Sequence, residues 1–249
     1  MSRYKKTRLD QLLVAQGFAE TRSRAADAIR RGCVSVDGVP ASKPGQPVFE
    51  NAKIVLSDDA LPYVSRGGLK LAAALDAFGF DPKGRAGLDI GAATGGFTDV
   101  LLSRGADHVY AVDVGRNQFH PRLREDPRVT VMEETDARTL EPARFASTIG
   151  AVVCDVSFIS ATLVLPRPLE LAAPGAWAVS LVKPQFELTP DAIGKSGIVR
   201  HELDRQVALA RVRDFLEFEA GWRIAGEIES PIAGGSGNKE FLIGAVKAG

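Results

Sequence analysis

One ten-residue stretch, residues 88–97, constrains the fold of this chain more than any other. It reads Leu-Asp-Ile-Gly-Ala-Ala-Thr-Gly-Gly-Phe, an apolar strand that runs into a glycine-rich turn. Glycine has no side chain, so a turn of this kind lets the backbone approach a bound nucleotide-like ligand closely. The stretch therefore predicts a parallel sheet with a ligand site at the carboxyl end of this strand.

From residue 63 onward the chain alternates strand-like and helix-like segments. Strands are expected at residues 86–90, 108–114, 129–133, 151–156, 177–183, 223–229 and 241–246. Helices are expected between them, notably at residues 68–77, 97–103, 162–172 and 204–219. Such alternation implies right-handed crossovers and a mostly parallel sheet that is covered on both faces. No helix separates the last two strands, so these should pair antiparallel. The predicted fold class of residues 63–249 is α/β, a Rossmann-like sheet with an antiparallel last strand.

The beginning of the chain follows a different pattern. Residues 8–16 read as a short amphipathic helix that the next glycine ends. A second helix runs through Arg31 from a cap at Thr21 or Ser23. Residues 33–39 alternate apolar and polar side chains into an Asp-Gly turn, the strongest short signal of a β-hairpin. We therefore expect a small α+β domain that, with its linker, occupies residues 1–62.

The net charge of zero hides an asymmetry between these two parts. Residues 1–45 carry nine Lys and Arg against four Asp and Glu, whereas the remainder carries 22 against 27. A positive surface attracts phosphate backbones by Coulomb forces and counterion release, which favours a nucleic-acid partner. The alternative is a solvated charged face that binds nothing. The residues expected to contact RNA are Arg3, Lys5, Lys6, Arg8, Arg22, Arg24, Arg30 and Arg31.

Helix, helix and hairpin, with arginines on the second helix, resemble the RNA-binding domain named after ribosomal protein S-four. The resemblance covers about residues 7–55. The motifs that carry it are Arg8-Leu9-Asp10, Ser23-Arg24-Ala25, Ile29-Arg30-Arg31-Gly32 and Val34-Ser35-Val36-Asp37-Gly38. The resemblance implies an RNA partner for the N-terminal domain.

Two classes of cofactor compete for the glycine-rich turn. A nicotinamide-type fingerprint, G-x-G-x-x-G, fits imperfectly, because counting from Gly91 puts Ala93 at the third position. Asp113 follows at the end of the next strand, where a carboxylate can accept hydrogen bonds from both ribose hydroxyls of an adenosine. That geometry serves either cofactor.

Taken whole, residues 89–98 resemble the S-adenosylmethionine-binding turn of ribose methyltransferases related to the heat-shock methyltransferase FtsJ, whose pattern is D-x-G-x-x-x-G-G-F. The resemblance implies a class I methyltransferase sheet and S-adenosylmethionine as the cofactor. It also implies that Asp136 contacts the adenine amino group. The implied cofactor-binding residues are Asp89, Gly91, Ala92, Thr94, Gly95, Gly96, Phe97, Asp113, Asp136 and Asp155.

The absence of certain residue types limits which chemical groups could accept the methyl group. Methylation at cytosine C5 needs a thiolate, but Cys154 lies inside an apolar strand and is interpreted as a core residue. Methylation of base amines commonly uses Asp/Asn-Pro-Pro-aromatic, whereas this chain has Asp-Val-Ser-Phe at residues 155–158. Base amines are therefore the weaker class of acceptor. Two unpatterned cysteines and three scattered histidines indicate no metal site.

Four polar residues stand at the ends of predicted elements. Lys70 lies in the first turn of the first helix of the domain, Asp155 and Lys183 end the fourth and fifth strands, and Glu240 precedes the last strand. Parallel strands end at the edge where an antiparallel neighbour begins, so we expect all four to converge beside the cofactor. Lys183 is expected to be the base, Lys70 to orient the hydroxyl, and the two carboxylates to position the lysines.

The motifs around these four residues resemble the TlyA family along nearly the whole chain. They read Ser-Arg-Gly-Gly-Leu-Lys at 65–70, Cys-Asp-Val-Ser-Phe at 154–158, Leu-Val-Lys-Pro-Gln-Phe-Glu at 181–187 and Gly-Asn-Lys-Glu-Phe at 237–241. The resemblance implies a Lys-Asp-Lys-Glu tetrad and 2′-O-methylation of a cytidine ribose in ribosomal RNA. Ribosomal RNA or ribosomal subunits are the implied partners.

Two other classes of function stay open. A non-catalytic RNA-binding or ribosome-assembly protein would keep the basic N-terminus but would have no use for the tetrad. A haemolysin, an old label of this family, would need a membrane segment, and no apolar stretch is long enough to span a bilayer or serve as a signal peptide. The expected location is the cytoplasm. Residues 187–200 lack periodicity and form either a lid over the RNA or a plain loop.

Overall fold

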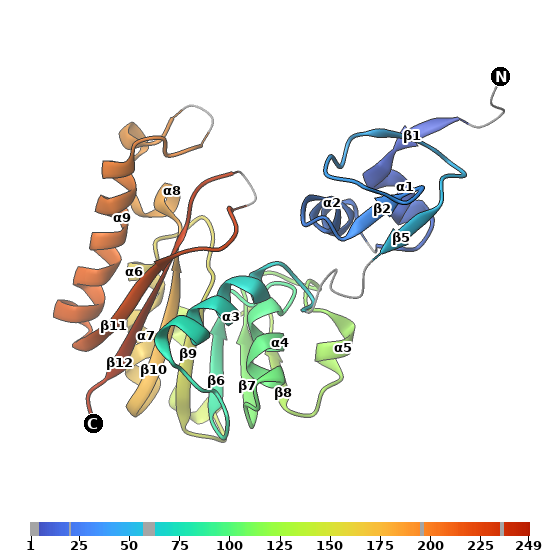
Figure 1. The fold of residues 1–249 in the computed structure, drawn as a ribbon. Helices are drawn as coiled ribbons and strands as arrows, with labels where there is room; N and C mark the ends of the chain where they lie inside the picture. Colours follow the sequence, from blue (N-terminus) through green and yellow to red (C-terminus); the bar gives the residue numbers. More distant parts are fainter. Residues whose placement is uncertain (1–4, 20, 57–62, 195–196, 235–236) are drawn as a thin grey trace. The chain divides into compact units, whose positions relative to one another are not determined.

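The computed structural model describes residues 5–19, 21–56, 63–194, 197–234 and 237–249. The chain divides into two compact units, Met1–Arg66 and Gly67–Gly249 (Figure 1). The domain boundary expected near residue 62 falls within residues 57–62, outside the described residues.

The N-terminal unit has the predicted two helices and hairpin. Helices α1 (Leu9–Ala15) and α2 (Arg22–Arg30) bury their apolar faces against short strands. Thr21, one of the two predicted caps, accepts a hydrogen bond from the Arg24 amide. Asp37 and Gly38 have φ angles of 51° and 82°, so both central turn residues are left-handed, as a tight hairpin requires. The strands are β1 (Lys6–Arg8), β2 (Val34–Val36), β3 (Val39–Pro40), β4 (Pro47–Phe49) and β5 (Ile54–Leu56).

The C-terminal unit is built on one seven-stranded sheet of order β11-β12-β10-β9-β6-β7-β8. Five strands run parallel, and β12 is antiparallel to both of its neighbours, which confirms the predicted fold class. The strands are β6 (Ala86–Ile90), β7 (His108–Val112), β8 (Val129–Met132), β9 (Ile149–Cys154), β10 (Ala172–Val182), β11 (Trp222–Glu229) and β12 (Phe241–Lys247).

Helices cover both faces of this sheet. Helices α6 (Ala161–Val164), α7 (Pro166–Leu171) and α9 (Glu202–Asp214) contribute to the core on one face, and Figure 1 shows α3 (Gly67–Phe78) and α4 (Gly96–Ser103) on the other. Short helices α5 (Pro121–Arg124) and α8 (Pro184–Glu187) follow β7 and β10. Among the described residues of the unit, 3₁₀ turns lie at Ala137–Thr139, Pro142–Arg144 and Pro190–Ala192.

Two predicted helices differ from the observed ones. The single helix expected over 162–172 is broken into α6 and α7, because Pro166 cannot donate the backbone hydrogen bond that would continue α6. The helix expected over 204–219 leaves α-helical geometry after Asp214 and ends in one π-helical turn, Phe215–Glu219.

Helix α3 packs closely on the antiparallel edge of the sheet through one aromatic ring. Phe78 lies over two glycines of neighbouring strands, Gly226 on β11 and Gly244 on β12. A Cβ atom at Gly244 would lie 2.5 Å from Cδ2 of Phe78, closer than packed carbon atoms allow. Gly244 thus brings α3 close to β12, the strand that Glu240 precedes.

We expect Gly244→Ala to lower the free energy of unfolding by about 1–3 kcal/mol, because the added methyl group overpacks the contact with Phe78. Urea denaturation measures the change. The double variant Gly244→Ala/Phe78→Leu should recover part of the loss, since the smaller side chain makes room. A single variant as stable as the wild type would contradict this account.

Candidate active site

A cavity of about 540 Å³ opens at the carboxyl ends of the parallel strands. Its wall comes from the segments that follow β6, β7, β8 and β9. Four residues selected from the sequence line it: Gly91, Asp113, Asp136 and Asp155. The lining residues that sequence reasoning missed include Ala93, Gln118, Thr135, Arg138, Ser157 and Phe158.

The glycine-rich turn after β6 depends on close backbone approach at one position. Gly91 has a φ of +79°, and a Cβ there would lie 2.6 Å from the carbonyl oxygen of Asp155. Only glycine fits, so the turn packs directly against the end of β9. The other turn residues expected to bind cofactor lie around this point and do not line the cavity: Ala92, Thr94, Gly95, Gly96 and Phe97. Phe97 and Ala92 are buried.

Asp113 joins the two loops on either side of the cavity. Its Oδ2 accepts a hydrogen bond from the Ala93 amide at 2.8 Å, and its Oδ1 accepts one from the Gly115 amide at 2.6 Å. Each carboxylate oxygen has further lone pairs, so the group can still accept hydrogen bonds from a ligand.

Asp136 reaches the same cavity from the segment after β8. It is held by Arg138, whose Nη2 lies 2.7 Å from Oδ2 and whose Nε lies 3.0 Å from Oδ1. This guanidinium lowers the pKa of Asp136, which keeps the carboxylate ionised as an acceptor. The sequence offered a signal for Arg138, since it lies two residues after the selected aspartate.

Asp89 has a different environment from the other selected carboxylates. It is fully buried below the turn and does not line the cavity. Its Oδ2 accepts a hydrogen bond from Thr98 at 2.6 Å, and its Oδ1 has no hydrogen-bond partner among the described residues. Burial, together with the negative charges of Asp155 and Asp113, raises the pKa of Asp89 to about 7.

The raised pKa makes Asp89 a source of pH-dependent stability. In the folded chain the carboxyl of Asp89 keeps its proton up to about pH 7, whereas in the unfolded chain it loses that proton near pH 4. The contribution of Asp89 to the free energy of unfolding is therefore fully present below about pH 4 and is lost as the pH rises through about 7. Asp89→Asn removes this dependence. We expect the ligand-free variant to gain stability over the wild type between pH 5 and pH 8, by an amount on the order of a few kcal/mol. Thermal unfolding at several pH values measures it, and parallel pH profiles of the two proteins would contradict the prediction.

The four tetrad residues form two ion pairs. Lys70 Nζ lies 2.5 Å from Glu240 Oε2, and both side chains are buried. Lys183 Nζ lies 2.7 Å from Asp155 Oδ1, without the alignment of a hydrogen bond. The same ammonium donates a hydrogen bond to Ser157 Oγ at 2.7 Å.

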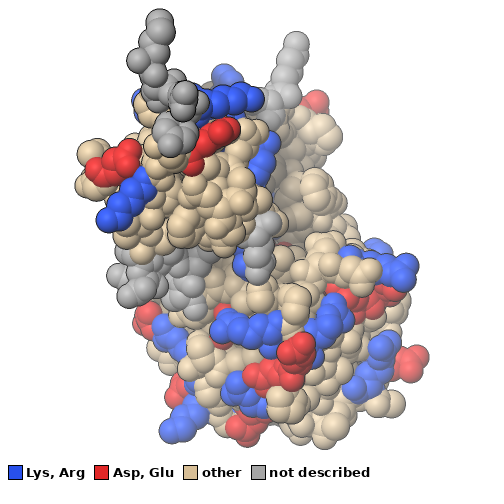
Figure 2. Space-filling view, turned by 90° about the vertical axis from the view of Figure 1, so that its right-hand side faces the viewer, with Lys and Arg blue, Asp and Glu red and all other residues tan. Residues whose placement is uncertain are grey.

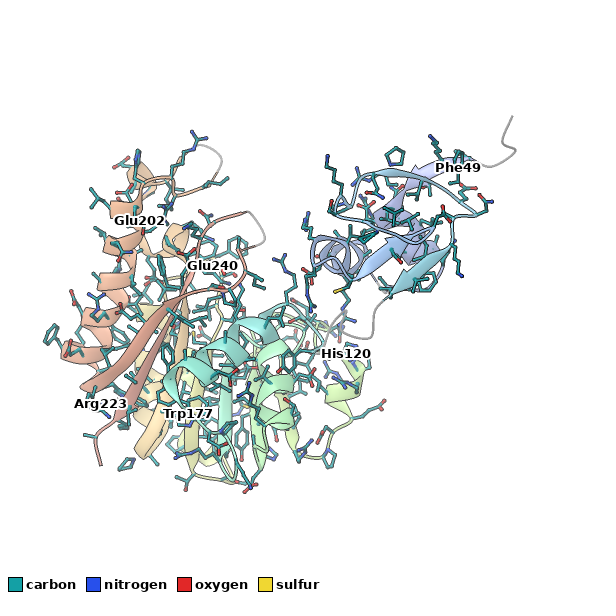
Figure 3. The ribbon with its side chains drawn as sticks, viewed as in Figure 1. Phe49, His120, Trp177, Glu202, Arg223 and Glu240 are labelled. Carbon is teal, nitrogen blue, oxygen red and sulfur yellow. The ribbon has the colours of Figure 1, made fainter. Side chains whose placement is uncertain are left out.

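Strand register places these pairs next to each other. Val182 of β10 pairs with Phe241 of β12, so the next residues outward, Lys183 and Glu240, face each other at the same edge. Figure 3 shows Glu240 at this end of β12. On the other side of β10 lies β9, and Asp155 follows its last residue. One row of alternating charges therefore runs from α3 across three strand ends.

An exposed aromatic residue stands next to this row. Phe158 is 91% exposed and has a φ of +67°, an unfavourable conformation for a bulky residue. Its ring centroid lies 5.2 Å from that of Phe186. Nothing in the sequence pattern distinguishes an exposed aromatic residue of this kind from a core one.

Cys154 is the core residue that the sequence indicated. It is fully buried in β9, and burial raises the pKa of its thiol to about 12. The reactive thiolate is therefore disfavoured at neutral pH.

Segment 187–200 contacts the loop that precedes β12. Asn238 is buried; its Oδ1 accepts a hydrogen bond from the Val199 amide, and its Nδ2 donates one to the Gly197 carbonyl. Lys195 and Ser196, in the middle of the segment, lie outside the described residues. Whether the segment is a lid or a plain loop stays a prediction.

In the N-terminal unit, a buried carboxylate organises two of the predicted RNA-contacting arginines. Asp10 accepts hydrogen bonds from Arg8 at 2.8 and 3.0 Å and from Arg22 at 3.2 Å. Hydrogen bonds from Arg8 are the main cause that lowers the pKa of Asp10 to about 2. The two guanidinium-bearing side chains remain about half exposed, at 49% and 58%.

The other predicted RNA contacts differ in their surroundings. Arg24 donates a hydrogen bond to the Val64 carbonyl, and Arg31 is partly buried. Lys5, Lys6 and Arg30 are exposed, with the Lys6 ammonium 4.9 Å from the centroid of the Phe49 ring labelled in Figure 3. Arg3 lies outside the described residues.

The basic residues of the C-terminal unit are mostly paired with acids. Figure 2 shows Lys and Arg next to Asp and Glu on the face of this unit that it presents. Arg122 pairs with Asp99 at 2.7 Å, and Arg124 pairs with Glu133 at 2.5 Å. In the part of the chain that the structure describes, no helix is both long and apolar enough to cross a membrane.

Comparison with known proteins defines the class. Residues 63–247 match the family model of FtsJ-like methyltransferases, and residues 7–54 match that of the S4 domain. Together with the fold, these matches define an S4 domain joined to an FtsJ-like methyltransferase.

Individual relatives define the family within this class. The chain is 44% identical over 241 residues to the 16S/23S rRNA (cytidine-2′-O)-methyltransferase TlyA of Mycobacterium tuberculosis, covering 96% of this chain and 89% of the relative. It is 39% identical over 236 residues to Hemolysin A of Brachyspira hyodysenteriae, covering 94% and 98%. A solved structure from Streptococcus thermophilus, 42% identical, has a TM-score of 0.76 and covers 98% of this chain and 89% of that chain. The chain belongs to the TlyA family.

Proposed function

We propose that this enzyme transfers the methyl group of S-adenosylmethionine to the ribose 2′-hydroxyl of a cytidine in ribosomal RNA. The observation that carries the proposal is the row of two lysines and two carboxylates, of which Asp155 also lines the cavity. The nucleotide and the ribosomal RNA come from the named activity of the Mycobacterium tuberculosis relative. Ribosomal subunits are found in the cytoplasm, and we place the reaction there.

The cavity suits S-adenosylmethionine in its donors and acceptors. An adenosine offers two ribose hydroxyls and an exocyclic amine, which are hydrogen-bond donors, and the wall presents Asp113 and Asp136 as acceptors. Gly91 lets the turn pack directly against the carbonyl oxygen of Asp155, another residue of the wall. When bound, S-adenosylmethionine supplies an electrophilic methyl group on a cationic sulfonium. Asp113 would then hold the ribose and Asp136 the adenine.

The tetrad supplies what a ribose hydroxyl lacks as a nucleophile. Lys183, in its neutral amine form, takes the hydroxyl proton as the oxygen–methyl bond forms and the sulfur–methyl bond breaks. Asp155, 2.7 Å away, stabilises the ammonium that results. Lys70, held by Glu240, is a second cation that orients the hydroxyl and stabilises negative charge developing on its oxygen.

Methyl transfer tests the proposal directly. Wild-type protein should transfer a tritiated methyl group from S-adenosylmethionine to ribosomal subunits, and mass mapping of the RNA should place it on a cytidine ribose. Lys183→Ala should lower kcat by about 10² or more, because the base is removed, and the variant should still bind the cofactor.

Lys83→Ala is the matched control, since Lys83 is an exposed lysine that precedes β6, at the opposite end of the strand from the tetrad. It should transfer at the wild-type rate. RNA binding without any transfer by the wild type would instead identify an RNA-binding or assembly protein. Near-normal transfer by Lys183→Ala would remove this lysine from the mechanism.

The N-terminal unit is the RNA-docking domain in this proposal. Arg8 and Arg22, fixed by Asp10, offer guanidinium groups in a set orientation, which lowers the entropy lost on binding a phosphate. The S4 match over residues 7–54 supports RNA as the partner.

We expect Arg22→Ala and Arg30→Ala each to weaken binding of a ribosomal RNA fragment and to leave cofactor affinity unchanged. Each lost phosphate contact should reduce the slope of log Kobs against log salt by about 0.7–0.9. Fluorescence anisotropy over a range of salt concentrations measures both quantities. Arg223→Ala, an exposed arginine of β11, is the control. Unchanged slopes for both test variants would exclude these arginines from the RNA interface.

A further inference from the structure

Two segments that follow neighbouring strands are joined by side-chain contacts along their length. One follows β9 and the other follows β10. At the inner end, Lys183 contacts Asp155 and Ser157, each at 2.7 Å. Further out, the rings of Phe186 and Phe158 lie 5.2 Å apart.

Glu187 closes the outer end of this pairing. Its carboxylate is buried, with 3% of the residue exposed. Oε2 accepts a hydrogen bond from Ser160 Oγ at 2.5 Å, and Oε1 accepts one from the Ala161 amide at 2.8 Å. The backbone carbonyl of Glu187 also accepts a hydrogen bond from Arg211 of α9 at 2.9 Å. A buried carboxylate is costly without partners, and here both oxygens have one.

The segment that carries Lys183 needs such an anchor. Helix α8 has only four residues, Pro184–Glu187, and a helix of one turn does not hold itself together in water. Its first residue is a proline, which follows Lys183 directly and donates no backbone hydrogen bond. The position of Lys183 therefore depends on what fixes the far end of α8.

We propose that Glu187 is a positioning residue for methyl transfer: its buried carboxylate locks the segment of Lys183 to the segment of Asp155, Ser157 and Phe158. The inference rests on the proposed function, since it concerns the same reaction. Misplacing a reacting group by about 1 Å can cost about 10² in rate, so a side chain that touches no substrate can still control turnover.

Two substitutions of Glu187 distinguish the effect of its hydrogen bonds from the effect of its negative charge. In Glu187→Gln, the amide oxygen can accept from Ala161, and the amide nitrogen can donate to Ser160, whose hydroxyl hydrogen can turn to Thr162 Oγ1 at 2.8 Å. This variant keeps the lock, and kcat should stay within about 3-fold of the wild type. Glu187→Ala removes the lock, and kcat should fall by about 10- to 100-fold. The cofactor Kd should change little in either variant.

Glu227→Ala is the control for a structural role alone. Glu227 pairs with Arg213 at 2.5 Å and so joins α9 to β11 in the same unit, away from the two segments. This control should lower Tm and leave kcat per folded molecule unchanged. If Glu187→Ala behaves in the same way, with lower Tm and unchanged kcat, the positioning role is overturned.

A second pair of variants covers the case in which Glu187→Ala does not fold. Ser160→Ala removes one donor, and in Ser160→Ala/Glu187→Gln the amide nitrogen loses its acceptor. The relative kcat of the double variant should differ from the product of the two single relative kcat values, because residues in contact are not additive. A kcat equal to that product would overturn the lock.

A wild type without transfer activity would refute the proposed function and this role with it, whereas an active wild type with an unaffected Glu187→Ala would refute this role alone.

Discussion

The active-site end of this fold depends on the neutralisation of buried charge at the edge of the sheet. Lys70 and Glu240 are both buried, and neither could be left alone there, because removing one partner of a buried pair costs about 3–5 kcal/mol. Their pairing requires that β12 run against the other strands, since only an antiparallel strand begins where β10 ends. The direction of β12 and the pairing of the two buried charges therefore depend on each other.

The same edge connects the cavity to the row of charges. Asp155 lines the cavity, pairs with Lys183, and presents its carbonyl oxygen to the turn at Gly91. Its amide donates a hydrogen bond to Ile90, so the end of β9 is held against the end of β6 as well. One residue therefore fixes the distance between the wall that would hold a cofactor and the lysine that would take a proton.

The sequence predicted the sheet well because its strands are apolar and its turn residues are specific. It predicted Asp37-Gly38 and the antiparallel β12 for the same local reasons. It failed where tertiary contacts decide: β10 begins at Ala172, earlier than residue 177, and Pro166 divides a helix that the apolar pattern made continuous. The site shows the same division. The charged residues at the strand ends could be predicted from the sequence. The roles of Phe158, Ser157 and the lock at Glu187 could not, because they depend on which loops lie together, and the spacing of residues in the sequence does not predict such contacts.

The electrostatics of the cavity also indicate what kind of ligand it favours. Asp89 lies below the turn; burial is the main cause of its raised pKa, and the negative charges of Asp155 and Asp113 raise that pKa further. Lys183 beside Asp155 and Arg138 beside Asp136 compensate part of this field. A neutral ligand would leave these carboxylates repelling one another, whereas a ligand with positive charge near the turn relieves the repulsion. The sulfonium and ammonium groups of S-adenosylmethionine carry that charge, and a pyrophosphate would add to the repulsion, which argues against a dinucleotide in the same cavity.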